Sequence, residues 1–281
     1  MTATREAQRV MLRGLVDDAG LFPPTELRMV PAVERHRSDR IVAHPMLTHR
    51  FLCPVSRWEE LRGRLGDGDH IDVGLILDTE AGLSGELPPT DPRIGVSHYE
   101  LRVRPGDLSN VADFHRSGAR GEAPRSVYFE PERGPDWLDA VRSLAGVRPL
   151  GAKVRCGGVH ESAFPTVEEL ADFVLTCVRN GVPFKATAGL HHAVRRTDPT
   201  TGFIHHGYLN LLLAAAIAVD AGGEDDVRTV LSLTDEQRLV RAFSEVTPQV
   251  ADHCRRLFVS YGSCSTRDPV ADAQRLGLET E

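Results

Sequence analysis

Short apolar runs alternate with helical segments along most of this chain, and this alternation limits the folds that it can adopt. Eight runs have the composition of strands: residues 14–18, 49–55, 71–78, 98–103, 126–131, the two runs that hold Lys153 and Lys185, and 256–263. The run 71–78 (IDVGLILD) is almost continuously aliphatic, as in a strand buried on both faces of a sheet. Helical segments between consecutive strands require those strands to be parallel.

Eight such units in a chain of 281 residues match a closed (β/α)8 TIM barrel of the α/β class. We predict a single domain over residues 1–281 that opens with a short helix over residues 4–13. An open, doubly wound sheet is the competing architecture. The sequence has no GxGxxG motif after its first strand and no P-loop, which disfavours the nucleotide-binding form of that alternative.

The composition is that of a globular protein, with 41% hydrophobic and 26% charged residues and a formal net charge of −7. The arginines are scattered and form no basic block, so we expect no nucleic-acid partner. The five cysteines form no CxxC pair, no segment has the pattern of a signal peptide, and the apolar run 211–219 is too short to cross a bilayer. We therefore expect a cytoplasmic protein that does not bind membranes. No residue pattern decides whether it is a homo-oligomer.

Lysine is rare in this chain. Of the 33 Lys and Arg residues, Lys153 and Lys185 are the only lysines, which leaves 31 arginines. Arginine stays protonated at physiological pH, whereas a buried ammonium can lose its proton and act as a nucleophile. The two lysines are 32 residues apart, about one βα unit, and each lies four residues before a glycine, Gly157 and Gly189. We interpret residues 150–192 as the part of the chain that carries the site.

The predicted barrel brings these residues together. Side chains alternate inward and outward along a strand, so Lys153 and Arg155 would share one face of the sixth strand, and Lys185 and Thr187 one face of the seventh. Neighbouring strands lie roughly 5 Å apart, which predicts that the two lysines meet at the mouth of the barrel. Desolvation and like charge would then leave one amine neutral at pH 7. A neutral amine suits an enzyme that forms an imine with a carbonyl substrate.

Such an enzyme also needs groups that move protons and hold the substrate. Four acids at predicted strand ends are candidates for proton transfer: Asp17, Asp18, Asp78 and Glu130. We favour Asp17 and Glu130. Arg155 would hold an anionic group, and a substrate hydroxyl would be positioned by Thr187, His191 or His192. Loops rich in small residues could offer backbone N–H groups to a phosphate at Gly189, Gly262 and Ser263.

The two lysine segments resemble a known enzyme family. A lysine on the sixth strand and another on the seventh, each followed by glycine in the pattern K-x-x-x-G, is similar to the class I, Schiff-base aldolases of the deoxyribose-phosphate aldolase type. The resemblance implies that Lys153 forms the imine and Lys185 perturbs it, although the neighbours of Lys185 (KATAG) match the family better, so the nucleophile stays open. The segments LVDDAGLFPP and FKATAGLHHAVR are also similar to an uncharacterised bacterial (β/α)8-barrel family.

The sequence therefore predicts a lyase that acts on a small carbonyl compound, with or without a phosphate group, through a lysine Schiff base and without a cofactor. One alternative is a hydrolase or lyase that uses Zn or Fe held by a cluster of histidines: His191, His192, His205 and His206. Cys156 is a further candidate nucleophile, although its phase suggests that it faces the helices. The lysines could instead be structural residues, ion-paired with carboxylates such as Glu130 in the barrel core. A barrel that only binds a ligand is a further alternative, and the absence of an acid or base near the lysines would be its sign.

Overall fold

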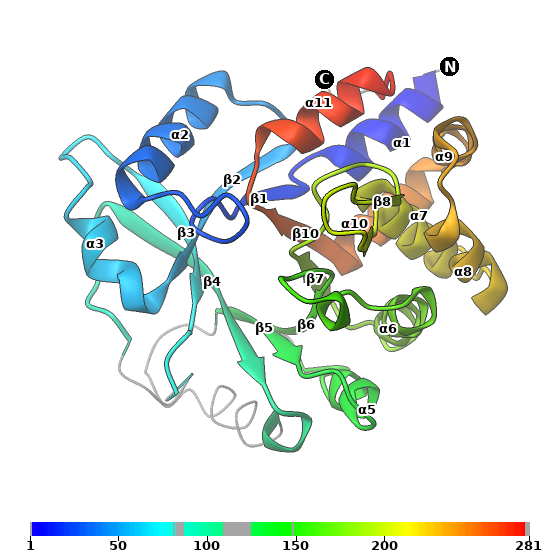
Figure 1. Cartoon of the computed structure of the whole chain (residues 1–281), viewed down its shortest axis with the longest axis horizontal. Coiled ribbons are helices and arrows are strands. Elements are labelled where there is room, and N and C mark those ends of the chain that lie inside the picture. The colour runs from blue at the N-terminus through cyan, green and yellow to red at the C-terminus, as the bar shows by residue number, and fades with distance from the viewer. Residues whose placement is uncertain (1, 81, 83–86, 109–124, 148, 279–281) are drawn as a thin grey trace.

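The computed structural model contains a closed barrel of eight parallel strands, which confirms the predicted TIM barrel and α/β class. It describes residues 2–80, 82, 87–108, 125–147 and 149–278. Figure 1 shows the strands at the centre of the molecule, with helices arranged around them. In order around the barrel the strands are β1 (Val16–Asp18), β2 (Leu47–Pro54), β3 (Ile71–Ile76), β4 (Ile94–Val103), β5 (Ser126–Pro131), β6 (Leu150–Arg155), β7 (Phe184–Thr187) and β10 (Phe258–Ser263).

Helices follow most of the strands, as the alternation predicts, although the described residues hold no α-helix directly after β3 or β4. The described helices are α1 (Thr2–Leu12), α2 (Met29–Val42), α3 (Trp58–Arg62), α5 (Trp137–Arg142), α6 (Val167–Arg179), α7 (Tyr208–Val219), α8 (Glu224–Ser232), α9 (Glu236–Ser244), α10 (Pro248–Leu257) and α11 (Arg267–Arg275). Between β7 and α7 the chain forms a small antiparallel hairpin of β8 (Arg196–Thr197) and β9 (Ile204–His205). Within the described residues, every helix is too short or too polar to span a membrane.

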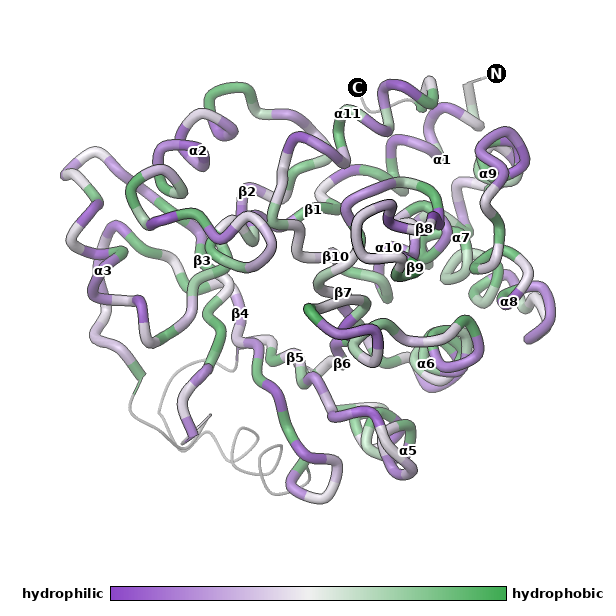
Figure 2. The backbone as a smooth tube through the Cα atoms, viewed as in Figure 1, coloured by the Kyte–Doolittle hydropathy of each residue, from purple (hydrophilic) through white to green (hydrophobic). Residues whose placement is uncertain are grey.

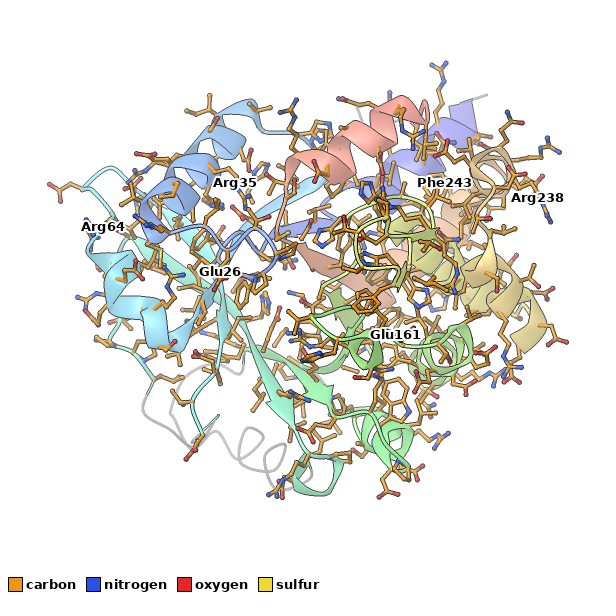
Figure 3. All side chains as sticks on the ribbon, in the orientation of Figure 1. Glu26, Arg35, Arg64, Glu161, Arg238 and Phe243 are labelled. Carbon is orange, nitrogen blue, oxygen red and sulfur yellow. The ribbon has the colours of Figure 1, made fainter. Side chains whose placement is uncertain are left out.

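The core lies inside the barrel and between the barrel and its helices. Helix α7 is apolar on nearly all sides, is largely hydrophobic in Figure 2, and is almost fully buried. Helix α9 is amphipathic instead. Figure 3 shows Arg238 pointing away from the molecule, whereas Phe243 of the same helix is buried. The apolar layer between the strands and the helices stabilises the barrel from outside. The interior of the barrel can therefore contain polar side chains without loss of the main hydrophobic core.

Most predicted strands are found within a few residues of their expected ends. Strand β4 begins at Ile94, four residues earlier than predicted, because Ile94 and Gly95 already pair with β3. Strand β10 begins at Phe258 because residues 256 and 257 complete α10. The helix expected over 107–115 lies mostly outside the described residues, and Pro105–Asp107 forms a 3-10 turn. The N-terminal helix predicted over 4–13 is found as α1.

Three positions have a sequence pattern typical of helix caps, and only one of them forms the cap. Thr166 and Glu169 form a capping box at the start of α6, because Thr166 accepts from the backbone N–H of Glu169 and the Glu169 side chain accepts in return. Ser56 and Glu59 have the same spacing, but the Ser56 hydroxyl binds the carboxylate of Asp78. Asp136 precedes α5 and makes no side-chain cap hydrogen bond. The alternative partner of Ser56 lies just after another strand, β3, which spacing alone does not reveal.

Candidate active site

Lys153 and Lys185 are direct neighbours in the barrel wall. Strands β6 and β7 pair in parallel, with Lys153 opposite Lys185 and Arg155 opposite Thr187. Both lysines are buried, with exposed fractions of 6% for Lys153 and 1% for Lys185. A spacing of one βα unit therefore predicted their adjacency correctly.

All three hydrogens of the Lys185 ammonium have acceptors. Nζ lies 2.8 Å from Asp17 Oδ2, 2.5 Å from Glu100 Oε1 and 2.7 Å from His98 Nε2. An ammonium has three donors, so this one is saturated. Lys185 also lies outside the lining of the large cavity described below. It is therefore a fixed cation within the barrel wall.

Lys153 has one fewer acceptor. Its Nζ lies 2.8 Å from Glu100 Oε2 and 3.1 Å from Glu130 Oε2, which leaves one ammonium hydrogen without an acceptor among the residues that the structure describes. Burial lowers the pKa of Lys153, but the two carboxylates outweigh burial and raise it above the usual value. The expectation that one of the two amines is neutral is therefore wrong for Lys153 in the free protein. The pairing of Lys153 with Glu130 is the one that the structural alternative expected, and Glu100, between the two lysines, was missed.

Glu100 is the residue between the two ammonium groups. It lies on β4 and is 1% exposed, and each of its carboxylate oxygens accepts from a different lysine. Burial raises the pKa of Glu100, but the charges of Lys153 and Lys185 outweigh burial and hold it well below the usual value. Sequence analysis did not single out Glu100. The alternation of His98, Glu100 and Arg102 along a predicted strand was the signal that could have found it.

Charges of alternating sign continue beyond the lysines in both directions. Toward the cavity, Glu130 Oε1 accepts from Arg155 Nε at 2.8 Å, and the Arg155 side chain is 46% exposed. Burial raises the pKa of Glu130, but Lys153 and Arg155 outweigh it, so the pKa is lowered. We call the following set the charge chain: Arg155, Glu130, Lys153, Glu100, Lys185, Asp17 and Arg50.

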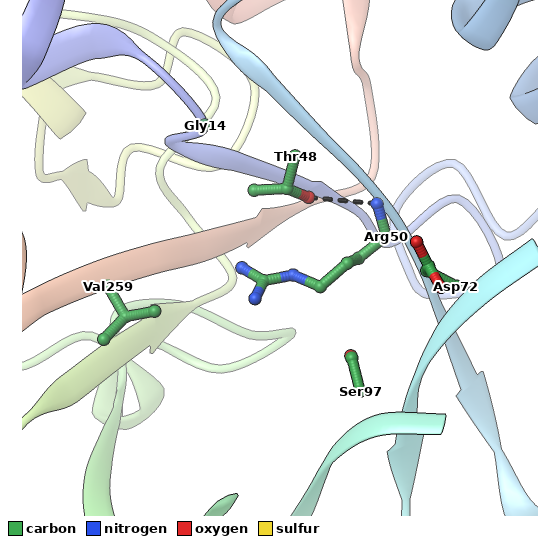
Figure 4. Close-up of a pocket in the computed structure, with 6 residues that line it drawn as sticks. All are labelled: Gly14, Thr48, Arg50, Asp72, Ser97 and Val259. Atoms are coloured by element: carbon green, nitrogen blue, oxygen red, sulfur yellow. Dashed lines mark hydrogen bonds between the residues drawn. The ribbon is translucent and has the colours of Figure 1, made fainter. Parts of the chain in front are cut away.

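The other end of the charge chain lies at the amino-terminal end of the barrel. Asp17 is fully buried and accepts from Thr48 Oγ1 at 2.6 Å, Arg50 Nε at 2.8 Å and Ser260 Oγ at 2.7 Å. Arg50 and Thr48 line a second cavity of about 490 Å³ (Figure 4). The pKa of Asp17 is lowered, because Lys185 and Arg50 outweigh the effect of burial. Asp17 therefore binds Lys185 on the side that faces the amino-terminal end of the barrel, and it does not line the large cavity.

His98 is the neutral member of this region. Burial and the charge of Lys185 lower its pKa to about 4. Its Nδ1 lies 2.9 Å from Ser97 Oγ, which itself donates to Val73 O. The tautomer that carries its hydrogen on Nδ1 lets Nδ1–H donate to Ser97 and Nε2 accept from Lys185, with Nε2 also 2.9 Å from Glu100 Oε1. Sequence patterns identified His98 only as the first residue of a predicted strand.

A cavity of about 1100 Å³ opens at the carboxyl ends of the strands. The charge chain reaches it through Glu100, Glu130, Lys153 and Arg155. Residues expected at the site also line it: Thr187, Gly189, His191, His192 and Gly262. Ser263 does not line it, because its buried hydroxyl donates to Ser265 O. The carboxyl end of the barrel is therefore hollow and polar on one wall.

Two of the acids suggested as proton-transfer groups are placed elsewhere. Asp18 follows Asp17 and points the opposite way, where it pairs with Arg35 of α2 and lies 3.3 Å from His36 Nδ1. Asp78 is exposed and binds the backbone and side chain of Ser56. Both expectations are wrong, and the alternation of strand side chains explains the first.

The four histidines of the metal alternative point to different partners. His206 Nε2 lies 2.7 Å from Pro165 O, His192 Nδ1 lies 3.2 Å from Asp272 Oδ2, and the His205 ring lies 4.6 Å from the Phe164 ring. Among the described residues, no group of three or more His, Cys, Asp or Glu side chains is arranged to hold a metal ion. The paired histidines therefore do not form the expected cluster.

Cys156 is fully buried, and burial raises the pKa of its thiol to about 12. It is therefore a poor nucleophile, as its position one residue out of phase with Lys153 and Arg155 suggested.

Comparisons of the chain with models of protein families, with curated proteins and with solved structures gave no match. The site must be interpreted from its own geometry.

Proposed function

We propose that this protein is a lyase that forms an imine between Lys153 and a carbonyl substrate. The observation that supports this proposal is the difference between the two lysines. Lys153 lines the large cavity and has one ammonium hydrogen for which the described part of the chain offers no acceptor, whereas Lys185 is saturated and lies outside the cavity lining. A substrate carbonyl oxygen can approach only the first of them.

The raised pKa of Lys153 requires a base for imine formation, and Glu130 is placed for that role. Its Oε2 lies 3.1 Å from Lys153 Nζ and it lines the same cavity. Glu130 would take a proton from the ammonium, and the free amine would add to the carbonyl carbon. Glu130 would then pass that proton to the carbinolamine oxygen and relay a second proton from the carbinolamine nitrogen to the same oxygen, which leaves as water. Atoms and charge balance, since an ammonium and a carbonyl give an iminium and water.

The same carboxylates that favour an ammonium also favour the iminium. The iminium nitrogen carries one positive charge in the place where Glu100 and Glu130 already surround a cation. A preorganised counter-charge of this kind stabilises a developing cation without reorganisation. The iminium can then accept the electron pair of a breaking carbon–carbon bond. Glu130, again a carboxylate after water has left, can take the proton of the substrate hydroxyl.

Substrate contacts follow from the cavity wall. Arg155 is about half exposed beside Glu130 and can bind an anionic group of the substrate. Thr187, His191 and His192 face the same space and can position a hydroxyl. A barrel that only binds a ligand would lack an acid or base beside its lysines, and Glu130 favours catalysis over that alternative.

Borohydride trapping tests the proposal. Protein is incubated with a panel of aldehydes and keto acids, reduced, digested and mapped by mass spectrometry. We expect a permanent adduct on the peptide that contains Lys153, none on Lys185, and loss of the adduct in a Lys153→Arg variant. Because the chain has two lysines, the α-amino group and Lys185 serve as internal controls in one sample. Full activity in a Lys153→Arg, Lys185→Arg double variant would contradict the proposal.

The metal-dependent alternative has its own test. Protein purified without chelators is analysed for Zn and Fe. Near-stoichiometric metal, with activity that is lost on chelation and restored by the ion, would favour the metal-dependent alternative. The same result together with failed trapping at Lys153 would contradict a Schiff-base mechanism.

A further inference from the structure

A thiol and an imidazole lie together on the wall of the large cavity, and neither contacts the two lysines in the described structure. Cys264 follows β10, and its Sγ lies 3.5 Å from Nδ1 of His191, which belongs to the segment after β7. The hydroxyl of Thr25, from the segment after β1, donates to the same sulfur at 3.1 Å. All three residues line the cavity. Three separate βα segments therefore converge on one thiol.

The other cysteines have different surroundings. Cys53, Cys156, Cys177 and Cys254 are 0% exposed, and burial raises the pKa of each of their thiols. None of the four lines the cavity. Cys264 is 5% exposed and borders it. A thiol with an adjacent imidazole and an open approach is the arrangement of a reactive cysteine, whereas a buried thiol without such a base is inert.

We propose that Cys264 and His191 form a thiol–imidazole pair that reacts with soft carbon electrophiles entering the cavity. For an α-halo carbonyl compound, His191 Nδ1 accepts the thiol proton while Sγ attacks the carbon that bears the halogen. The sulfur–carbon bond forms, the carbon–halogen bond breaks, and the halide leaves with its electron pair. The Thr25 hydroxyl donates to the developing thiolate. This chemistry does not involve Lys153 and is independent of the imine.

The surroundings of His191 suit a proton acceptor. Burial is the main cause that lowers its pKa, so the ring is neutral at pH 7. The nearby charge of Asp268 favours the imidazolium that forms on proton transfer, and Arg196 opposes it. His205 also lies close enough to interact with His191 electrostatically. The charges of these groups influence the pH below which His191 is protonated and can no longer accept the thiol proton.

The test is alkylation with iodoacetamide, followed by peptide mass mapping of all five cysteines. At pH 7 we expect Cys264 to be labelled first and at least tenfold faster than any other cysteine of the folded protein. The rate in a His191→Asn variant should fall at least tenfold at pH 7. Below neutral pH, the variant should lose about a factor of ten per pH unit, as an ordinary thiol does, while the original protein loses less.

A matched pair at Thr25 separates activation from simple access. Thr25→Ala should slow labelling of Cys264, and Thr25→Ser, which keeps the hydroxyl, should restore the rate. Circular dichroism and thermal unfolding verify that each variant is folded. The proposal is overturned if another cysteine is labelled first, or if His191→Asn is labelled as fast as the original protein. Labelling should be unchanged in Lys153→Arg, so failure of the imine and failure of the thiol pair are distinguishable.

Discussion

Lys153 and Lys185 face each other across the β6–β7 pair and bind the two oxygens of one carboxylate, that of Glu100. This arrangement explains how two buried ammonium groups can lie side by side. Each lysine also has a second carboxylate partner, Glu130 or Asp17. The alternation of sign is therefore the condition for the lysine pair to exist inside the barrel.

Removal of the charge between the lysines should be costly. Glu100→Gln keeps the shape of the side chain but leaves two buried ammonium groups without their shared partner, and we expect a loss of about 3–5 kcal/mol in the free energy of unfolding. Urea denaturation measures it. Glu132→Gln is the matched control, because Glu132 is exposed and its ion pair with Arg102 is 3.4 Å long. Similar losses in both variants would show that Glu100 does not hold the lysines.

Stability should fall as the pH drops from about 6.5 toward about 4, because of two buried histidines. Burial lowers the pKa of both His98 and His206 from 6.5 to about 4. In this window the unfolded chain binds protons that the folded protein does not, so acid favours unfolding. Each histidine contributes roughly 1.4 kcal/mol per pH unit across the window. Denaturation at a series of pH values measures the slope.

A variant pair identifies the source of that slope. His206 has a backbone carbonyl partner at Nε2 and Arg195 at Nδ1, both compatible with a neutral ring. His206→Gln should remove the contribution of one histidine, roughly 1.4 kcal/mol per pH unit, while His98 and other groups with lowered pKa values, such as His191, still contribute. His253→Gln, at an exposed position on α10, should leave it unchanged. An unchanged slope in both variants would argue against buried histidines as the cause.

The barrel and the lysine pair could be predicted because both depend on periodicity along the chain. Alternating runs fix the parallel strands, and a separation of one βα unit places Lys153 beside Lys185. The position of Glu100 could not be predicted in this way. It lies on β4, two strands from β6, and the height of its side chain depends on the stagger of the closed barrel. Spacing along the sequence does not determine that stagger.

The directions of the four histidines of the metal alternative could not be predicted for a different reason. Adjacent side chains point opposite ways only in an extended strand. Ala188 and Gly189 have φ values of 60° and 68°, so the chain leaves the extended conformation before it reaches His191. The directions of His191 and His192 are then set by the loop and by partners such as Cys264 and Asp272. No periodic pattern encodes such partners.

Two candidate helix caps give a paired test of local structure. Thr166 accepts from the N–H of Glu169 at 3.1 Å at the start of α6, whereas Asp136 makes no such bond before α5. Thr166→Ala should therefore lower the free energy of unfolding by about 1 kcal/mol, and Asp136→Ala should leave it nearly unchanged. The midpoints of urea denaturation report both. Equal shifts in the two variants would mean that the cap bond does not stabilise α6.

Gly189 is the point where the loop after β7 turns toward the cavity, and a side chain there should disturb the site. Its φ is +68°, and an added Cβ would lie 2.3 Å from the backbone oxygen of Cys156. Gly181 has a similar φ of +63° with open space around it, so Gly181→Ala should cost only about 1–2 kcal/mol of backbone strain. Gly189→Ala should cost more, because backbone atoms must move. It should also slow borohydride trapping at Lys153, since the shifted loop carries His191 and His192, whereas Gly181→Ala should not. Equal costs, with trapping unaffected in both variants, would mean that the loop adapts without moving the cavity wall.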